Sequence, residues 1–470
     1  MNIPTGLLQS LQNINGFDQR AFEEVHMSGE QITSIRINPY KWLTGKSEWP
    51  KEAHTHHSSF AIQNSVPWTD FGYYLSQRPS FTFDPVFHAG CFYVQEASSM
   101  FLEQALKQTV DLSLPLKILD LCAAPGGKST HIQSLISAES ILVSNEVIKS
   151  RTGILKQNII KWGCENVVIT NNDPQHFSRL KGFFDVLVID APCSGSGLFR
   201  KTPAAIDEWS KENVLMCCGR QKRIIADAFA SLKQDGILIY STCSYSKEEN
   251  EDIADWLTLE LKMKNEELVI KKDWGIVETN AEKTGALGYR FFPDKIKGEG
   301  FYISCFRKTT EAREQNYRPP KLEQITTDEK KVVEAWLKKT DIVLLKTPFI
   351  YILPAALMND YSVLKSALNI QYAGVNIGEI MRGKLIPDHA LALSKLLDDK
   401  IPATELEHPE AINYLQRAHL NINTIQKGWQ LVTYQCHNLG WINALPNRIN
   451  NYYPKELRIL KSVNDSDFQK

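Results

Sequence analysis

Residues 117–130 read KILDLCAAPGGKST, and this stretch decides the expected fold. Its first five residues form a short apolar run that predicts a buried strand, and the Pro-Gly-Gly that follows predicts a tight turn into a helix. Glycines let a ligand approach the backbone closely, and the start of a helix offers unpaired N–H groups. The stretch therefore predicts a ligand-binding loop at the carboxyl end of a strand.

Several ligands use a turn of this kind, and the loop alone does not separate them. A dinucleotide site would need G-x-G-x-x-G, which is absent here. A P-loop would need G-x-x-x-x-G-K-[ST]; Gly127, Lys128 and Ser129 match it, but Cys122 stands where the first glycine belongs. At this point a P-loop ATPase competes with a protein that binds a nucleoside cofactor.

Short β-branched runs alternate with amphipathic helical stretches on both sides of the loop. The expected strands are 117–121, 140–145, 167–170, 185–190, 236–241 and 301–306, and the expected helices are 128–135, 149–162 and 215–232. This alternation predicts a Rossmann-like α/β core, with a mostly parallel sheet and helices on both faces. Ligands of such sheets lie at the carboxyl ends of the strands.

Acidic residues stand at or just after four successive strand ends: Asp120, Glu146, Asp173 and Asp190. A carboxylate after the second strand hydrogen-bonds ribose hydroxyls in Rossmann-like sites, which is the expected role of Glu146. Asp173 is expected to meet an adenine amino group. Because a P-loop enzyme has no need of such acids, this pattern favours a nucleoside cofactor.

Two cysteines follow the fourth and fifth strands, Cys193 in DAPCSGSG and Cys243 in STCS. Carbon 5 of cytosine is a poor nucleophile, and it becomes reactive when a thiolate adds to carbon 6. The reaction also needs a base for the proton on carbon 5 and an acid near the ring nitrogen. Cys193, Cys243 and Asp190 supply candidates for all three roles at one edge of the sheet.

The segments DLCAAPGGK, DAPCSG and STCS, in this order, resemble the Nop/Sun family of RNA 5-methylcytosine methyltransferases. The resemblance implies a class I methyltransferase core in which Cys243 is the covalent nucleophile and Cys193 assists product release. Asp190 would contact the cytosine and the cofactor, and Lys128 resembles the family's active-site lysine. The expected contacts to S-adenosylmethionine are Cys122, Ala123, Ala124, Pro125, Gly126, Gly127, Lys128, Glu146, Asp173 and Asp190. DNA enzymes use the cysteine of the Pro-Cys motif as nucleophile, so the presence of Cys243 indicates RNA.

The resemblance extends over nearly the whole chain and suggests its domains. Residues 1–95 would be an N-terminal RNA-binding extension, 96–308 the catalytic domain and 309–330 a polar linker. Residues 331–470 would form an α+β PUA-like RNA-binding domain, because the tail is similar to that of the ribosomal small-subunit methyltransferase F group. Its basic and aromatic residues suit phosphates and bases, although a packed core with ordinary surface charge would use the same residue types.

Composition bounds the remaining possibilities. The 53 basic and 54 acidic residues exclude a uniformly basic nucleic-acid binder but allow a local basic surface. The nine cysteines lack zinc-ligand spacing, and His54, His56 and His57 have no cysteine or carboxylate nearby, so no metal is expected. The absence of a signal peptide and of a long apolar run predicts a cytoplasmic protein without membrane contact. A monomer is expected.

The sequence thus predicts methyl transfer to a cytosine of RNA, with small-subunit (16S) ribosomal RNA as the expected substrate. Three alternatives stay open. The same chemistry could act on transfer RNA, the chain could be a non-catalytic RNA-binding ribosome assembly factor, or it could be a P-loop ATPase. The resemblance of the tail favours the ribosome, with naked ribosomal RNA or the assembled small subunit as the substrate.

Overall fold

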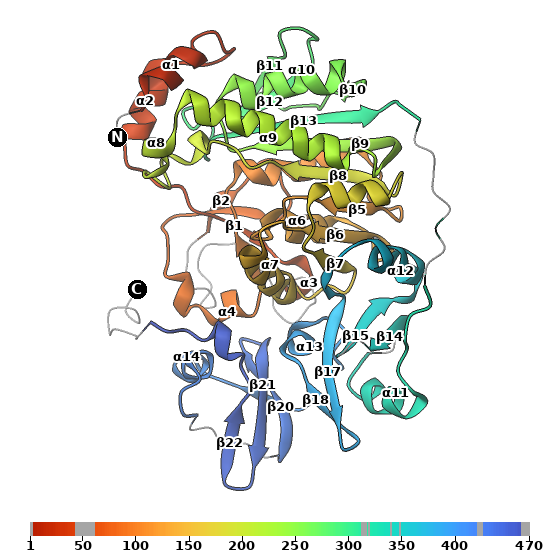
Figure 1. Cartoon of the computed structure of the whole chain (residues 1–470). Helices are drawn as coiled ribbons and strands as arrows, with labels where there is room; N and C mark the ends of the chain where they lie inside the picture. Colours follow the sequence, from red (N-terminus) through yellow and green to blue (C-terminus); the bar gives the residue numbers. More distant parts are fainter. Residues whose placement is uncertain are drawn as a thin grey trace.

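The computed structural model describes residues 3–42, 62–311, 317, 320–338, 341–346, 349–420 and 426–461. A central sheet fills the middle of the molecule, a small N-terminal sheet lies beside it, and two further sheets follow toward the C-terminus (Figure 1). His54, His56 and His57 lie outside the described residues.

The central sheet has the strand order β11-β12-β13-β9-β8-β5-β6-β7-β16, with β10 paired to β13. Strands β7, β6, β5, β8 and β9 are parallel, whereas β13 runs antiparallel to β9. The five parallel strands are β5 (Lys117–Asp120), β6 (Ile141–Asn145), β7 (Val167–Thr170), β8 (Phe184–Asp190) and β9 (Leu232–Thr242). The others are β10 (Met263–Glu266), β11 (Val277–Asn280), β12 (Leu287–Phe291), β13 (Phe301–Lys308) and β16 (Ile370–Ala373). All six strands expected in this region are confirmed to within a few residues.

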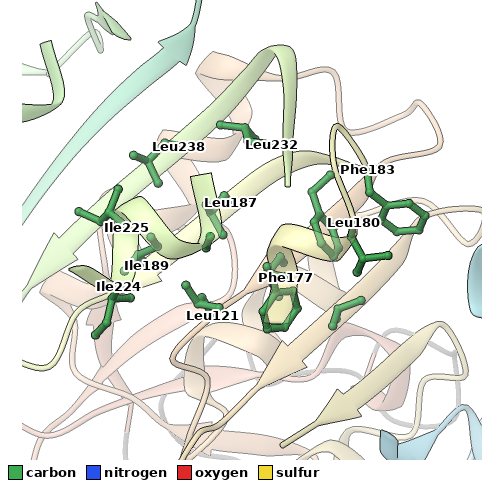
Figure 2. Packing of buried hydrophobic residues seen from close by; sticks show 14 of the residues in the cluster. Leu121, Phe177, Leu180, Phe183, Leu187, Ile189, Ile224, Ile225, Leu232 and Leu238 are labelled. Carbon is green, nitrogen blue, oxygen red and sulfur yellow. The ribbon is translucent and has the colours of Figure 1, made fainter. Parts of the chain in front are cut away.

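Both faces of the sheet are buried, as expected for parallel strands covered by helices. In β8, Val186 and Val188 face one apolar cluster, whereas Leu187 and Ile189 face the other. The first cluster contains residues of α5 (Leu102–Thr109), α6 (Gly127–Leu135) and α7 (Lys149–Trp162). The second contains residues of α9 (Lys211–Phe229) and α10 (Glu251–Leu259). Figure 2 shows Leu187 and Ile189 packed with Ile224 and Ile225 of α9.

The N-terminal extension comprises α1 (Thr5–Leu11), α2 (Gln19–Met27), α3 (Pro39–Trp42), α4 (Pro85–His88) and the sheet β2-β3-β1-β4. Its strands are β1 (Ser34–Ile37), β2 (Ile62–Ser65), β3 (Gly72–Leu75) and β4 (Phe92–Val94). Most of the aromatic side chains of residues 68–94 are buried or partly buried in this unit and against the core. These side chains therefore contribute to the packing between the extension and the core.

Arg36 of β1 joins the N-terminal sheet to the catalytic core. It is fully buried and donates to the Gly127 and Thr130 carbonyls and the Thr130 hydroxyl in the first turns of α6, while its guanidinium lies 4.4 Å from the Trp162 ring. Burial lowers the pKa of Arg36 to about 9. The guanidinium therefore ties the extension to the helix that follows the glycine-rich turn.

The C-terminal part begins with α11 (Thr327–Glu334), which starts inside the expected linker 309–330. A sheet of β14 (Ile342–Lys346), β15 (Ile350–Pro354), β17 (Val375–Met381) and β18 (Lys384–Pro387) follows, with α12 (Met358–Ala367) and α13 (His389–Leu393). The last sheet contains β19 (Ala403–Glu405), β20 (Gly428–Tyr434), β21 (His437–Leu445) and β22 (Arg448–Asn451), beside α14 (His408–Gln416).

One strand of this C-terminal part belongs to the central sheet. β16 pairs antiparallel with β7, so that Ile370 lies opposite Thr170 and Ala373 opposite Val168. The expected domain of residues 331–470 is therefore joined to the catalytic core by backbone hydrogen bonds, which the sequence did not indicate. None of the described helices is long and apolar enough to cross a membrane.

Leu187→Ala should lower the free energy of unfolding by about 2 to 5 kcal/mol, because Leu187 is fully buried on the face covered by α9 and its removal leaves a cavity. Urea unfolding followed by tryptophan fluorescence measures the change. Val269→Ala is the matched control, since Val269 is 77% exposed and its truncation should change stability by less than about 0.5 kcal/mol. Equal unfolding midpoints for the two variants would contradict the assigned packing.

Candidate active site

The glycine-rich turn lies at the carboxyl end of β5, as expected. Gly126 has φ +112°, a left-handed conformation that L side chains rarely adopt, and Gly127 begins α6. The peptide bond between Ala124 and Pro125 is cis. The backbone of the turn thus leads directly into the N-terminus of a helix, where N–H groups are available to an anionic group.

Asp120 lies directly beneath this turn. Its carboxylate is fully buried; one oxygen accepts a 2.6 Å hydrogen bond from Ser129, and the other has no hydrogen-bond partner among the described residues. Burial raises the pKa of Asp120 to about 7, and the nearby Asp190 adds to the increase. A buried oxygen without a partner is rare in folded proteins, so this carboxylate fits a site that receives a polar or cationic ligand.

Glu146 at the end of β6 is buried and accepts a 2.8 Å hydrogen bond from the backbone N–H of Ile148. Arg151 of α7 lies 3.5 Å from the Glu146 carboxylate and also donates to the Ala124 carbonyl of the glycine-rich turn. Arg151 therefore links the end of β6 to the turn that follows β5. Asp173 accepts from the Gln175 N–H and caps a short 3-10 helix, so its carboxylate already has a structural role.

The structure brings the two motif cysteines together. The Sγ atoms of Cys193 and Cys243 lie 3.1 Å apart, although 50 residues separate them in sequence. The contact with Cys243 raises the pKa of Cys193 well above its ordinary value, and burial adds to the increase. Because Cys193 keeps its proton, its thiol can donate to the sulfur of Cys243.

Lys128 and Asp190 complete this edge of the sheet. The Lys128 ammonium lies 2.8 Å from Asp190 Oδ2, and Asp190 Oδ1 accepts a 2.9 Å hydrogen bond from the Ser241 hydroxyl. The ammonium also lies 5.2 Å from the centre of the Phe301 ring. Burial, the largest single effect, works against the charge of Lys128, but Asp190, Asp120 and Cys243 together outweigh it and raise the pKa of the ammonium, so Lys128 remains charged.

The predicted residues therefore fall into two neighbouring groups. Cys193, Cys243, Lys128 and Asp190 form one group, and the turn 122–127 with Glu146 forms the other. Asp173 stands at the end of β7, farther along the same edge, since the strand order is β8-β5-β6-β7.

Sequence reasoning missed two contributors to this site. Arg151 lies in an amphipathic helix without a motif, and no local signal identifies it. Glu249 accepts hydrogen bonds beside both cysteines, and the acidic run KEENE that closely follows STCS was the available signal. Among the described residues, no group of three His, Cys, Asp or Glu side chains could hold a metal ion.

The basic and aromatic residues near the C-terminus divide between core and surface. Trp441 and Tyr453 are buried, whereas Tyr452 is 41% exposed and packs against Trp429 at 4.3 Å between ring centres. The exposed basic residues are Lys427, Arg448, Lys455, Arg458 and Lys461. The buried aromatic side chains thus confirm the expected packed core, whereas a role of the exposed basic side chains in binding phosphates stays a prediction.

The parallel strands β7, β6, β5, β8 and β9, with β13 inserted antiparallel beyond β9, have the topology of a class I methyltransferase. A glycine-rich turn after β5 and an acid after β6 lie where such enzymes bind their nucleoside cofactor. A crystal structure of NSun6 from Pyrococcus horikoshii with SFG has the same fold, at a TM-score of 0.53 and 20% identity. The match covers 66% of this chain and 99% of that one.

Sequence comparisons identify the family. Residues 108–307 match the family described as 16S rRNA methyltransferase RsmB/F, residues 3–97 the N-terminal domain of 16S rRNA methyltransferase RsmF, and residues 402–459 the RsmF PUA domain. The chain is 30% identical over 410 residues to ribosomal RNA small subunit methyltransferase F of Shewanella woodyi, covering 83% of this chain and 84% of that protein. The corresponding protein of Shewanella loihica is 28% identical over 413 residues, which is 83% of each chain. The chain belongs to the 16S rRNA methyltransferase RsmB/F family.

Asp120→Asn should flatten the pH dependence of stability in the ligand-free protein. The folded state raises the pKa of Asp120 from 3.8 to about 7, so the stability that it contributes is present below pH 3.8 and is lost as the pH rises to about 7. The amide cannot ionise, so the variant should gain stability relative to the native protein across this interval, by up to about 1.4 kcal/mol per pH unit. Urea unfolding at several pH values between 4.5 and 7.5 measures the difference.

The difference in stability between the native protein and Asp120→Asn at each pH isolates the contribution of Asp120, because the other titrating groups are present in both proteins. Glu299, whose pKa burial raises to about 7, is one of these groups. Stability curves that stay parallel across this interval would contradict the shifted pKa of Asp120.

Proposed function

We propose that this protein transfers a methyl group from S-adenosylmethionine to carbon 5 of a cytosine in RNA, through a covalent bond between Cys243 and the base. The observation that carries the proposal is the 3.1 Å approach of Cys193 and Cys243, beside the Lys128–Asp190 ion pair. Methylation of adenine or of an exocyclic amine needs no cysteine. Two adjacent thiols at the cofactor edge of a methyltransferase sheet fit carbon-5 chemistry.

The residues supply the steps that this chemistry needs. The Cys243 thiolate adds to carbon 6 of cytosine, which makes carbon 5 nucleophilic. Asp190 and Lys128 would lie beside the base, where a proton donor would neutralise the negative charge that this addition places on the ring. After transfer, a base takes the proton from carbon 5, the electron pair of that bond re-forms the double bond between carbons 5 and 6, and Cys243 leaves as a thiolate. Cys193 lies within reach of this last step, which suits the release role that the family pattern implies.

The cofactor site is assigned to the turn 122–128, Glu146, Asp173 and Asp190. S-adenosylmethionine, when bound there, would supply an electrophilic methyl group. Glu146 would accept hydrogen bonds from ribose hydroxyls at the end of β6, and the N-terminus of α6 would meet the carboxylate of the methionine portion. The buried Asp120 oxygen that has no hydrogen-bond partner among the described residues would suit a cationic group of the cofactor.

Small-subunit ribosomal RNA is the proposed substrate, because the relatives named above carry that activity in their names and match this chain over most of its length. We assign catalysis to residues 96–308 and RNA contact to residues 1–95 and 331–470, where the PUA match and the exposed basic residues lie. Transfer RNA remains the second candidate substrate. The P-loop ATPase reading loses its support, since the topology is that of a methyltransferase.

Cys243→Ala should abolish methylation while S-adenosylmethionine still binds, because the sulfur reacts with the base and lies outside the glycine-rich turn. In the Cys193→Ala variant, Cys243 should still attack the base, but release of the methylated RNA should be slow. A covalent protein–RNA adduct should therefore accumulate and survive denaturing electrophoresis. Cys436→Ala is a matched control, because Cys436 is an exposed cysteine of the C-terminal part. Full methylation by the Cys243 variant would overturn the covalent mechanism, and a missing adduct would remove the release role of Cys193.

Deletion of the gene should remove one 5-methylcytosine from small-subunit ribosomal RNA, as read by bisulfite sequencing of total RNA. A gene copy encoding native protein should restore the site, and one encoding Cys243→Ala should not. Loss of a transfer RNA site instead would identify the second candidate substrate. If no site is lost, the assembly-factor alternative gains weight, and calorimetry with S-adenosylmethionine would then test for cofactor binding.

A further inference from the structure

Glu249 lies behind the two cysteines, in the short 3-10 helix Lys247–Glu249 that precedes α10. Its side chain is fully buried, and its carboxylate accepts four hydrogen bonds. One oxygen accepts from the Ser194 N–H at 2.9 Å and from Gln221 at 3.1 Å. The other accepts from the hydroxyls of Ser194 at 2.6 Å and Ser244 at 2.5 Å.

These partners directly follow the two cysteines in sequence. Ser194 comes after Cys193, and Ser244 comes after Cys243. The two serine hydroxyls also lie 3.1 Å from each other, so a single carboxylate holds both loops at one point. Glu249 itself is anchored, because its backbone carbonyl accepts a 2.7 Å hydrogen bond from the buried Tyr240 hydroxyl.

Among the described residues, no basic side chain pairs with this carboxylate: its donors are two hydroxyls, one amide side chain and one backbone N–H. A buried carboxylate without a cationic partner is costly to keep in a fold, and hydrogen bonds must compensate it. Burial raises the pKa of Glu249, and the four donors act against this increase. An apolar side chain at this position would stabilise the fold equally well. The buried carboxylate therefore indicates a role in holding the positions of the loops that it contacts.

We propose that Glu249 is a positioning residue that fixes the distance between Cys193 and Cys243 by clamping the loops that carry them. The proposal rests on the proposed function for its catalytic meaning, since both sulfurs must reach adjacent carbons of one cytosine ring. The distance between the two sulfurs, however, is a property of the folded protein and can be tested without the proposed activity. A second contact supports the same loops, because the Gly197 N–H donates to the Cys243 carbonyl at 2.8 Å. Glu249, by contrast, accepts hydrogen bonds from a residue next to each cysteine.

Three substitutions separate the possible roles of the carboxylate. Glu249→Ala removes every hydrogen bond of the clamp. Glu249→Asp keeps the charge but is one methylene shorter, so it cannot span the two serines from the same backbone position. Glu249→Gln has the length of the native side chain, and the two serine hydroxyls can rotate to accept from its amide. We therefore expect Gln to rescue the clamp and Asp to fail.

The first readout needs neither RNA nor cofactor. Diamide oxidises two neighbouring thiols to a disulfide and is itself reduced to the hydrazine, so the rate of Cys193–Cys243 bond formation reports how closely the sulfurs approach. Peptide mapping by mass spectrometry measures it. Native protein and Glu249→Gln should form this bond at similar rates, whereas Glu249→Ala and Glu249→Asp should form it at least about tenfold more slowly.

The second readout is methyl transfer to RNA. Glu249→Ala and Glu249→Asp should lower kcat by about 100-fold, the loss expected from a misplacement of about 1 Å, while KM for RNA and the Kd for S-adenosylmethionine stay within about twofold. Glu249→Gln should stay within about threefold of native kcat. If Glu249 had a merely structural role, kcat and thermal stability would fall together in all three variants, and Glu249→Gln would not restore kcat.

Asp255→Asn is the matched control. Asp255 is a buried carboxylate of α10 that also accepts only neutral donors, the N–H groups of Lys283 and Thr284 and the Thr284 hydroxyl, and none of these belongs to a cysteine loop. Its substitution should leave the disulfide rate and kcat unchanged. Native disulfide rates and native kcat in Glu249→Ala and Glu249→Asp would overturn the clamp. Native protein that fails to methylate any RNA would instead overturn the proposed function, while the disulfide rates would still test the clamp.

Discussion

The parallel register of β8 and β9 is the constraint on which the catalytic edge depends. Backbone hydrogen bonds place Asp190 opposite Ser241 at the ends of the two strands. Cys193 follows the first strand by three residues and Cys243 follows the second by one, so both loops begin at the same level of the sheet. A shift of the register would separate the two sulfurs and break the Asp190–Ser241 hydrogen bond. The buried residues on both faces of β8 hold this register, because a shift by one residue would exchange the two faces.

Negative charge is concentrated beneath this edge, and this has an energetic cost. Asp120 and Glu249 are fully buried, and burial raises the pKa of each. Lys128 brings a largely buried positive charge close to the sheet end, where it pairs with Asp190. S-adenosylmethionine carries a sulfonium and an ammonium group, so the proposed cofactor would offset part of this imbalance. Binding would then couple to stability, since a ligand that prefers the folded state stabilises it.

The flanking units are attached to the core at defined points. Arg36 binds the first turns of α6, so the N-terminal sheet supports the helix that begins at the glycine-rich turn. β16 adds the C-terminal part to the edge of the central sheet beside β7. The exposed basic residues near the C-terminus are therefore connected to the catalytic edge through continuous structure. This arrangement suits a protein that must hold a large RNA while one of its bases enters the site.

The sequence by itself determined the elements and their chemistry. The alternation of strands and helices over residues 117–308, the glycine-rich turn and the two cysteine motifs were all readable, because each depends on consecutive residues. The strands β10, β11, β12 and β16 were not predicted, since such short strands lack a strong period and are defined by the neighbours they pair with. Only the tertiary structure decided that Cys193 lies 3.1 Å from Cys243, that Lys128 pairs with Asp190, and that Glu249 joins both cysteine loops. These contacts link residues about 50 or more positions apart, or depend on the path of a loop. Strand register and packing set such distances, and no local pattern of residues encodes them.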